Sequence, residues 1–232
     1  MTSSQWSHRG GDVPPDIDTF LAQRKRQGST LLVTGAVDET ISGIATRRLL
    51  GDPGRERKRV LAFSDASADY VDYCLPVDTP RDDPDVWVVT PDGTHRGGPV
   101  PDDGAKLSTG GVGPEDVAGL QAELTQAVTR YDDASEGLAP AELRLGVISL
   151  AGFLEANDRS TVEQFLRTLG ELVRGVDGMA HVHLPVPDAD PLVDELSPLF
   201  DARIELRHRE TFLPEQRWHV PEHGITTLWT EL

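Results

Sequence analysis

Short apolar runs between turn residues alternate with amphipathic segments along most of this 232-residue chain. Runs of this kind are typical of strands buried on both faces of a parallel sheet. They predict strands over residues 30–34, 59–63, 85–89, 143–150 and 179–186. Residues 91–112 form the longest segment with little pattern.

Apolar positions at helical spacing separate these runs, and they predict the helices that would cover such a sheet. We expect helices from Asp16, over residues 40–50, from Pro114, from Ser160 and from Asp190. The helix from Ser160 is the clearest, because a Ser-Thr-Val-Glu capping box precedes its apolar stripe. After residue 202 the pattern changes to alternation, which predicts two or three antiparallel strands.

Strands that alternate with helices predict a three-layer α/β domain with a mostly parallel sheet and an antiparallel C-terminal edge. We expect residues 1–28 to form a tail and a short helix, and residues 29–232 to form a single domain. The first twelve residues lack the apolar segment of a signal peptide, and no run of about 18 apolar residues could span a membrane. The lone cysteine, Cys74, excludes an internal disulfide and is expected to be buried. A cytoplasmic location fits these features.

The charge balance narrows the range of partners. The chain carries 39 Asp and Glu against 22 Lys and Arg, a net charge of −17. Such a surface repels phosphate, which argues against nucleic acid or an anionic membrane as the partner. Only Lys25, Lys58 and Lys106 are lysines, and excess carboxylate with scarce lysine keeps a protein hydrated in concentrated salt. We interpret the charge as halophilic, since a GC-rich genome alone would explain the arginines but not the total.

The turn after the first predicted strand has the spacing of a phosphate-binding P-loop, G-x-x-x-x-G-K-[ST]. Gly35 takes the place of the first glycine and Ser42 that of the hydroxyl that binds magnesium. Thr40 replaces the second glycine, and Ile41 replaces the lysine. Gly35, Thr40 and Ser42 are therefore the candidate residues of a vestigial nucleotide-binding loop.

The replacements remove what a nucleotide needs. The Cβ of Thr40 hinders close approach of a phosphate, and Ile41 supplies no charge for the β and γ phosphates. Asp38 and Glu39 place carboxylates where backbone amides would cradle those phosphates. We expect no ATP or Mg²⁺ cofactor and no catalytic residue here. Taken alone, the turn is best interpreted as an ordinary connection between a strand and a helix.

Five segments carry a family resemblance: Leu31-Leu-Val-Thr-Gly35, Arg47-Arg-Leu-Leu-Gly51, Leu143-Arg-Leu-Gly-Val-Ile-Ser-Leu150, His181-Val-His-Leu-Pro185 and Glu215-Gln-Arg-Trp-His219. In this order, from about Thr30 to the end, the chain resembles uncharacterised haloarchaeal proteins of the RecA superfamily. The resemblance implies a RecA/KaiC-like P-loop NTPase-type fold with degenerate Walker motifs. It also implies that Ile148 stands where the family's Walker B strand has an Asp, and isoleucine cannot hold magnesium through water.

The absence of charge at both Ile41 and Ile148 indicates a pseudo-ATPase. We expect a non-catalytic domain that acts in regulation or signalling through an unidentified protein partner, with self-association also open. One alternative is a nucleotide-binding ATPase that uses nonstandard groups, such as Ser42 and Asp65 with the metal. Another is a nucleic-acid-associated RecA relative that uses the basic segment between Arg47 and Arg59.

Three further features have both a structural and a functional interpretation. His181 and His183 alternate on a predicted strand, so both point to one face. They would form a metal site only if His208, His219 or Asp188 completed it, and hydrogen-bonded histidines are the simpler interpretation.

The basic segment contains Arg47, Arg48, Arg55, Arg57, Lys58 and Arg59 but no aromatic stacking platform, so a charged turn explains it. Trp218 and Trp229 fit either packing or a subunit interface.

Overall fold

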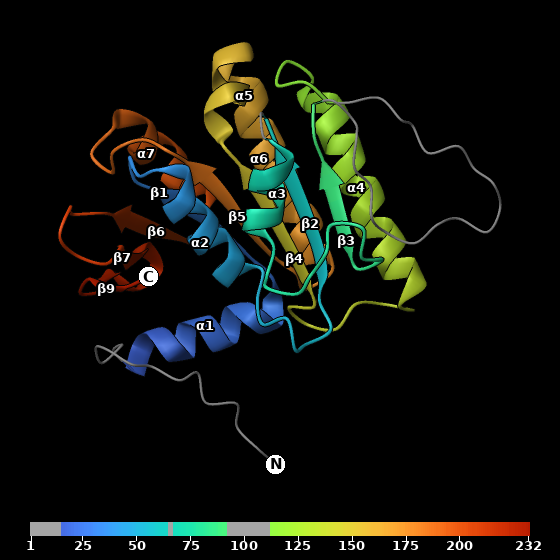
Figure 1. The fold of residues 1–232 in the computed structure, drawn as a ribbon, viewed down its shortest axis with the longest axis horizontal. Coiled ribbons are helices and arrows are strands. Elements are labelled where there is room, and N and C mark those ends of the chain that lie inside the picture. Colours follow the sequence, from blue (N-terminus) through green and yellow to red (C-terminus); the bar gives the residue numbers. More distant parts are fainter. Residues whose placement is uncertain (1–14, 65–66, 92–111) are drawn as a thin grey trace.

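Nine strands form one sheet in the described part of the chain, with helices packed on both of its faces (Figure 1). The computed structural model describes residues 15–64, 67–91 and 112–232. The helices are α1 (Pro15–Gln27), α2 (Glu39–Leu49), α3 (Ala68–Cys74), α4 (Val117–Ala134), α5 (Leu150–Ala156), α6 (Arg159–Gly175) and α7 (Pro191–Leu196). The strands are β1 (Ser29–Thr34), β2 (Lys58–Phe63), β3 (Val86–Val89), β4 (Leu143–Ile148), β5 (Met179–Leu184), β6 (Ala202–Arg207), β7 (Glu215–Val220), β8 (Ile225–Thr226) and β9 (Thr230–Glu231).

The sheet is mixed and mostly parallel, as the sequence predicts. Its order is β3-β2-β4-β5-β1-β6-β7-β8, and β9 pairs with β7. The strands from β3 to β6 pair in parallel, whereas β7, β8 and β9 are joined by antiparallel pairing. Four strands follow residue 201, and three of them, β7, β8 and β9, form the antiparallel edge, which agrees with the two or three antiparallel strands that the alternation predicts.

Alternate residues of each parallel strand face opposite layers of helices. On β2, Val60 and Ala62 belong to the core beneath α4 and α6, whereas Leu61 and Phe63 pack with α3. Strands covered on both faces bury successive side chains in apolar layers, which explains why apolar residues predominate in these runs. We call the two sides of the sheet the α6 face and the α2 face. Ile41 of α2 packs on β1 from the second of these.

Helix α6 is positioned by its apolar stripe. Phe165, Leu166 and Leu169 are each at most 3% exposed and pack against the sheet. Truncation of such side chains to alanine costs about 2–5 kcal/mol. The start of this helix differs from the prediction: Asp158, extended at φ −61° and ψ 141°, is the N-cap, so Ser160 lies inside the first turn and forms no capping box.

The segment after β4 also differs from the prediction. The strand ends at Ile148 rather than at residue 150, because Ser149 turns into the left-handed region and Leu150 begins α5.

Among the helices of the described ranges, none is both long and apolar enough to cross a membrane. Asp65, the N-terminal tail before Pro15 and most of the weakly patterned segment lie outside the described residues.

Candidate functional site

The turn between β1 and α2, where the sequence placed a vestigial P-loop, is short and tightly bound to its neighbours. The Gly35 N–H donates to the Val186 carbonyl at 2.9 Å, and Gly35 has φ +127°. A Cβ at this position would lie 2.3 Å from the carbonyl oxygen of Leu206 on β6. Glycine is therefore required here by the approach of β6, with or without a phosphate.

The amino end of α2 is capped from within the chain. An Oδ1 atom of Asp38 accepts the Ile41 N–H at 3.1 Å, so a carboxylate already occupies the position where a helix amino end attracts an anion. Thr40 is exposed, whereas Ser42 is 9% exposed and buried beside the sheet. The three candidate residues thus share one turn, but the helix directs Thr40 and Ser42 to different environments.

Ile41 and Ile148, for which the resemblance implies the loss of the Walker charges, are both core positions. Ile41 is 3% exposed and packs with Phe20, Leu31 and Val33. Ile148 is 4% exposed and packs in the cluster formed by β2, β3 and α3. An unpaired charge at either position would be buried in an apolar environment at a cost of several kcal/mol.

Backbone strain marks the end of β4. Ser149 has φ +67°, which is unusual for a residue other than glycine. Its carbonyl accepts the Ser64 hydroxyl at 3.0 Å, which links the ends of β2 and β4. At the carboxyl ends of these two strands, the polar groups of Ser64 and Ser149 thus bind each other.

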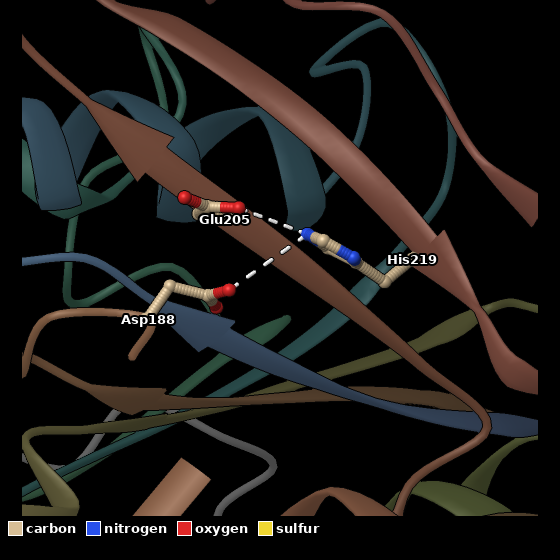
Figure 2. Close-up of side chains that lie close together, drawn as sticks. All are labelled: Asp188, Glu205 and His219. Atoms are coloured by element: carbon tan, nitrogen blue, oxygen red, sulfur yellow. Dashed lines mark hydrogen bonds and ion pairs between the residues drawn. The ribbon is translucent and has the colours of Figure 1, made fainter. Parts of the chain in front are cut away.

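A half-buried group of acidic and basic side chains lies beside the turn between β1 and α2, on the α6 face of β6 and β7. Asp188, Glu205 and His219 each offer one atom, and these atoms lie within 4.8 Å of one another (Figure 2). Thr34 at the end of β1 donates its hydroxyl to Asp188 at 2.6 Å. His219 Nε2 is 2.9 Å from Glu205 Oε2. A carboxylate pair and one imidazole could hold a divalent cation.

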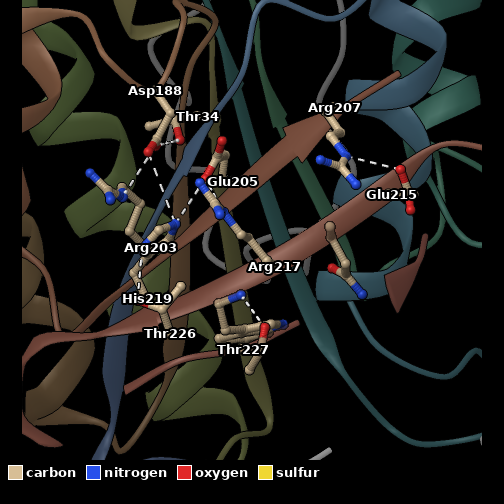
Figure 3. A network of polar contacts seen from close by, with 12 residues as sticks. Thr34, Asp188, Arg203, Glu205, Arg207, Glu215, Arg217, His219, Thr226 and Thr227 are labelled. Atoms are coloured by element: carbon tan, nitrogen blue, oxygen red, sulfur yellow. Dashed lines mark hydrogen bonds and ion pairs between the residues drawn. The ribbon is translucent and has the colours of Figure 1, made fainter. Parts of the chain in front are cut away.

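Arginines already satisfy these carboxylates. Arg203 lies 3.2 Å from Asp188, and Arg217 lies 2.5 Å from Glu205 (Figure 3). Burial acts to raise the pKa of Glu205, but hydrogen bonds from Arg217 and His219 outweigh it and lower that pKa. A cation would have to displace both arginines.

We therefore interpret the group as an ion-pair network. It continues along the same strands, where Arg207 pairs with Glu215 at 2.9 Å. We call the whole set the paired network, consisting of Asp188, Arg203, Glu205, Arg207, Glu215, Arg217 and His219.

The predicted histidine pair lies on the opposite face of the sheet. His181 and His183 register with Leu31 and Val33 of β1, and their ring centroids are 5.5 Å apart. Burial lowers the pKa of His183 to about 4, and burial followed by the charges of His183 and Arg144 lowers the pKa of His181.

Both imidazoles are therefore neutral at pH 7. His183 Nε2 shares a hydrogen bond of 3.0 Å with the Thr46 hydroxyl. The residues suggested as further metal ligands do not join this histidine pair. His219 and Asp188 lie together with Glu205, and His208 is exposed.

The basic segment is divided among separate contacts. Arg47 stacks on Tyr73 with its guanidinium carbon 4.8 Å from the ring centroid, and Lys58 pairs with Asp85 at 2.7 Å. Arg57 directly precedes β2, and Arg59, the second residue of that strand, is only 4% exposed. Arg47, Lys58 and Arg59 are therefore held by contacts within the chain.

The structure also shows the surroundings of Cys74 and of the two C-terminal tryptophans. Cys74 is buried, and burial raises the pKa of its thiol to about 12, so it is unreactive. Trp229 contacts two arginines of the paired network, with the guanidinium carbons of Arg207 and Arg217 at 3.7 and 4.6 Å from its ring centroid. Trp218 packs beside the β1–β6 core.

Sequence reasoning missed Arg203, Glu205 and Arg217. The alternation of charged and apolar residues in β6 and β7 was the available signal, because it indicates a sheet face left without a covering helix. It also missed Arg144, which is 7% exposed and interrupts an otherwise apolar strand.

The fold and site define an α/β protein with a mixed, mostly parallel sheet and a capped turn at the position of the predicted vestigial nucleotide loop. The chain belongs to a family of unknown function (DUF7504), whose model matches residues 28–206. No curated protein matches the chain with significance. The matched range includes the turn and every strand of the parallel part, whereas β7, β8 and β9 lie beyond it.

Proposed function

We propose that this chain is a RecA/KaiC-like domain without ATPase activity, which acts in regulation or signalling through contacts with other proteins. The observation that carries this proposal is the Asp38 carboxylate bound to the Ile41 N–H at the amino end of α2. A phosphate at this helix end would compete with a covalently attached anion and would meet its negative charge.

The strand order is compatible with this proposal. β5 lies between β1 and β4, the two strands that the resemblance matches to the Walker A and Walker B strands. Two such strand ends are about 10 Å apart, a span that a nucleotide triphosphate with magnesium can bridge. Here Ile41 and Ile148 are both buried, so the bridging charges are missing from both sides.

Exposed apolar side chains support a role in protein contact. Phe212 and Leu213, in the connection between β6 and β7, are 57% and 62% exposed, and Leu228, in the connection between β8 and β9, is 81% exposed. Large apolar side chains that stay exposed are available for contact with a partner protein. A separate open groove of about 800 Å³ beside α3 is lined by Arg47 and Asp72, among others, but by none of Gly35, Thr40 and Ser42.

Calorimetric titration with Mg-ATP in molar KCl tests the pseudo-ATPase part. We expect no binding heat for the wild-type chain, and micromolar binding would overturn the proposal in favour of the nonstandard ATPase. Asp38→Ala sharpens the test, because it removes the internal anion while leaving Ile41 in the core. Its expected cost is about 1 kcal/mol of folding stability, the loss of an N-cap.

Asp133→Ala, an equal charge change at an exposed position near the end of α4, is the matched control. If Asp38→Ala alone gains ATP affinity, Asp38 is what excludes the nucleotide. If neither variant binds, the missing lysine and aspartate at positions 41 and 148 are sufficient to explain the loss.

A further inference from the structure

Two arginines lie side by side at the amino ends of β2 and β4, at the opposite edge of the sheet from the capped turn. Arg59 and Arg144 are direct partners in the β2–β4 register, and both point to the α2 face. They are 4% and 7% exposed. Like charges placed opposite each other on neighbouring strands destabilise a sheet, so this arrangement needs a compensating group.

The protein satisfies these guanidinium groups with neutral carbonyls. Arg144 donates to the Ala141 carbonyl at 3.1 Å and to the Leu49 carbonyl at 3.4 Å. Arg59 donates to the carbonyls of Asp52 at 3.2 Å and Arg57 at 3.3 Å. Carbonyl dipoles satisfy N–H donors but leave the net charge uncompensated.

A third arginine, Arg57, completes the group. Within the described ranges, none of Arg57, Arg59 and Arg144 forms an ion pair with a carboxylate, and the buried Nε atoms of the first two have no hydrogen-bond partner. Burial lowers the pKa of Arg57 and of Arg59, and burial and the other arginines lower the pKa of Arg144.

Nearby acids counter this effect only in part. Glu142 and Asp52 act to raise the pKa of Arg57, and Asp83, Asp85 and Asp52 act to raise that of Arg59. Asp85 is already paired with Lys58. These acids therefore do not neutralise the positive charge of the three arginines.

Two of the side chains face the same small space. A Cβ built on Gly51, which follows α2 with φ +85°, would lie 3.5 Å from Arg57 Nε and 3.8 Å from Arg144 Nε. The Nε atoms of Arg57 and Arg144 therefore face one point beside the Gly51 Cα, where a single carbon would touch both of them. Arg57 is half-buried and forms the solvent side of the group.

We propose that Arg57, Arg59 and Arg144 form a binding site for a small oxyanion, either phosphate or the phosphoryl group of a small molecule. Guanidinium forks match the oxygens of such anions in bidentate geometry. Because Arg59 and Arg144 are buried, only a compact group can reach them. The site is independent of the proposed function, since it lies at the amino ends of the strands.

Titration with inorganic phosphate at constant ionic strength, with KCl as the balancing salt, tests the proposal by thermal unfolding and calorimetry. We expect a saturable rise in the Tm of the wild-type chain, because a ligand bound only to the folded state stabilises it. Arg57→Gln should weaken phosphate binding at least tenfold. Arg57→Lys keeps the charge but loses the fork, so an intermediate affinity is expected.

Arg167→Gln is the matched control, since Arg167 is an exposed arginine on α6. It should bind phosphate as the wild type does. Glycerol phosphate distinguishes the two sources: tighter binding than inorganic phosphate indicates a small-molecule phosphoryl group, and equal or weaker binding indicates free phosphate. The proposal is overturned if chloride shifts Tm as much as phosphate does, or if Arg57→Gln, shown by circular dichroism to be folded, responds like the wild type.

Discussion

Basic side chains occur in two contrasting settings in this molecule. On β6 and β7 the arginines of the paired network each lie beside a carboxylate, as Arg203 does with Asp188 at 3.2 Å and Arg207 with Glu215 at 2.9 Å. On the α2 face of β2, β4 and β5, in contrast, no described carboxylate pairs with the basic groups. We call this second set the basic strip, consisting of Arg57, Arg59, Arg144, His181 and His183.

The difference does not come from a shortage of acids, since the chain has 39 Asp and Glu against 22 Lys and Arg. It follows from position. The paired network lies on a sheet face without a covering helix, where an ion pair keeps part of its hydration and loses little on folding. The basic strip lies under α2, where a carboxylate would have to be desolvated along with its partner. The strip therefore holds its two histidines in the neutral state, and Arg59 and Arg144 donate to backbone carbonyls.

Acidification should affect the basic strip most strongly. The pKa of His183 is about 4 in the folded state, against 6.5 for an ordinary histidine. Between these values the unfolded chain binds a proton that the folded chain does not, so stability is complete above pH 6.5 and falls as the pH drops toward 4. The expected loss from His183 is about 3 kcal/mol, from about 1.4 kcal/mol per pKa unit. Urea unfolding at pH 7, 5.5 and 4.5 measures it.

His183→Gln isolates this effect. It removes the titration and keeps a group that can bond the Thr46 hydroxyl, so its unfolding free energy should vary less with pH over this window. His208→Gln, at an exposed position, should retain the wild-type slope. Equal slopes for all three chains would mean that His183 is not the group that titrates.

The second largest effect should come from Glu205→Gln in the paired network. This change removes the charged acceptor of Arg217 and His219 while conserving shape. We expect a loss of about 2 kcal/mol at pH 7, the range for a charged hydrogen bond in a partly buried pair. Urea unfolding at pH 7 measures the loss.

The pH dependence of Glu205→Gln has a definite sign. The pKa of Glu205 is lowered in the folded state, so its contribution is present above its ordinary value of 4.5 and disappears as the pH falls through the folded value. The wild type and the variant should therefore converge in stability below pH 4.5. A constant difference at all pH values would show that packing, not charge, causes the loss.

The sequence predicted the parallel strands because burial on both faces leaves a continuous apolar run, as in Val86–Val89. It could not predict which strands are neighbours. Asp188 and Glu205 meet because the loop after β5 and the strand β6 both flank β1, an order that no local pattern specifies.

Local patterns also misjudged one helix start, where Asp158 rather than Ser160 is the cap. For the turn, the residues alone indicated that phosphate binding is lost. They did not reveal that the Asp38 carboxylate caps the amino end of α2, since capping depends on backbone angles.

A smaller effect, of opposite sign, is expected when one charge is removed from the basic strip. Arg57→Gln relieves repulsion with Arg59 and Arg144, as the lowered pKa values of these groups indicate. In phosphate-free buffer at low salt, the variant should be more stable than the wild type by about 0.5 kcal/mol, the scale of a like-charge pair. Urea unfolding in 20 mM and 1 M KCl measures it, and the gain should vanish in 1 M KCl because salt screens the repulsion. A loss of stability at low salt would mean that the strip is already neutralised.

The smallest effect should come from Glu163→Gln, which breaks the exposed pair between Glu163 and Arg167 on α6. These side chains are 3.0 Å apart but 31% and 51% exposed, so water competes for both charges. Pairs of this kind contribute about 0.3 kcal/mol, and 1 M KCl should remove most of it. Urea unfolding of this variant beside Glu205→Gln therefore compares the same chemical change at two degrees of burial. If the two variants lose equal stability, burial is not what separates the paired network from an ordinary surface pair, and the contrast with the basic strip must have another cause.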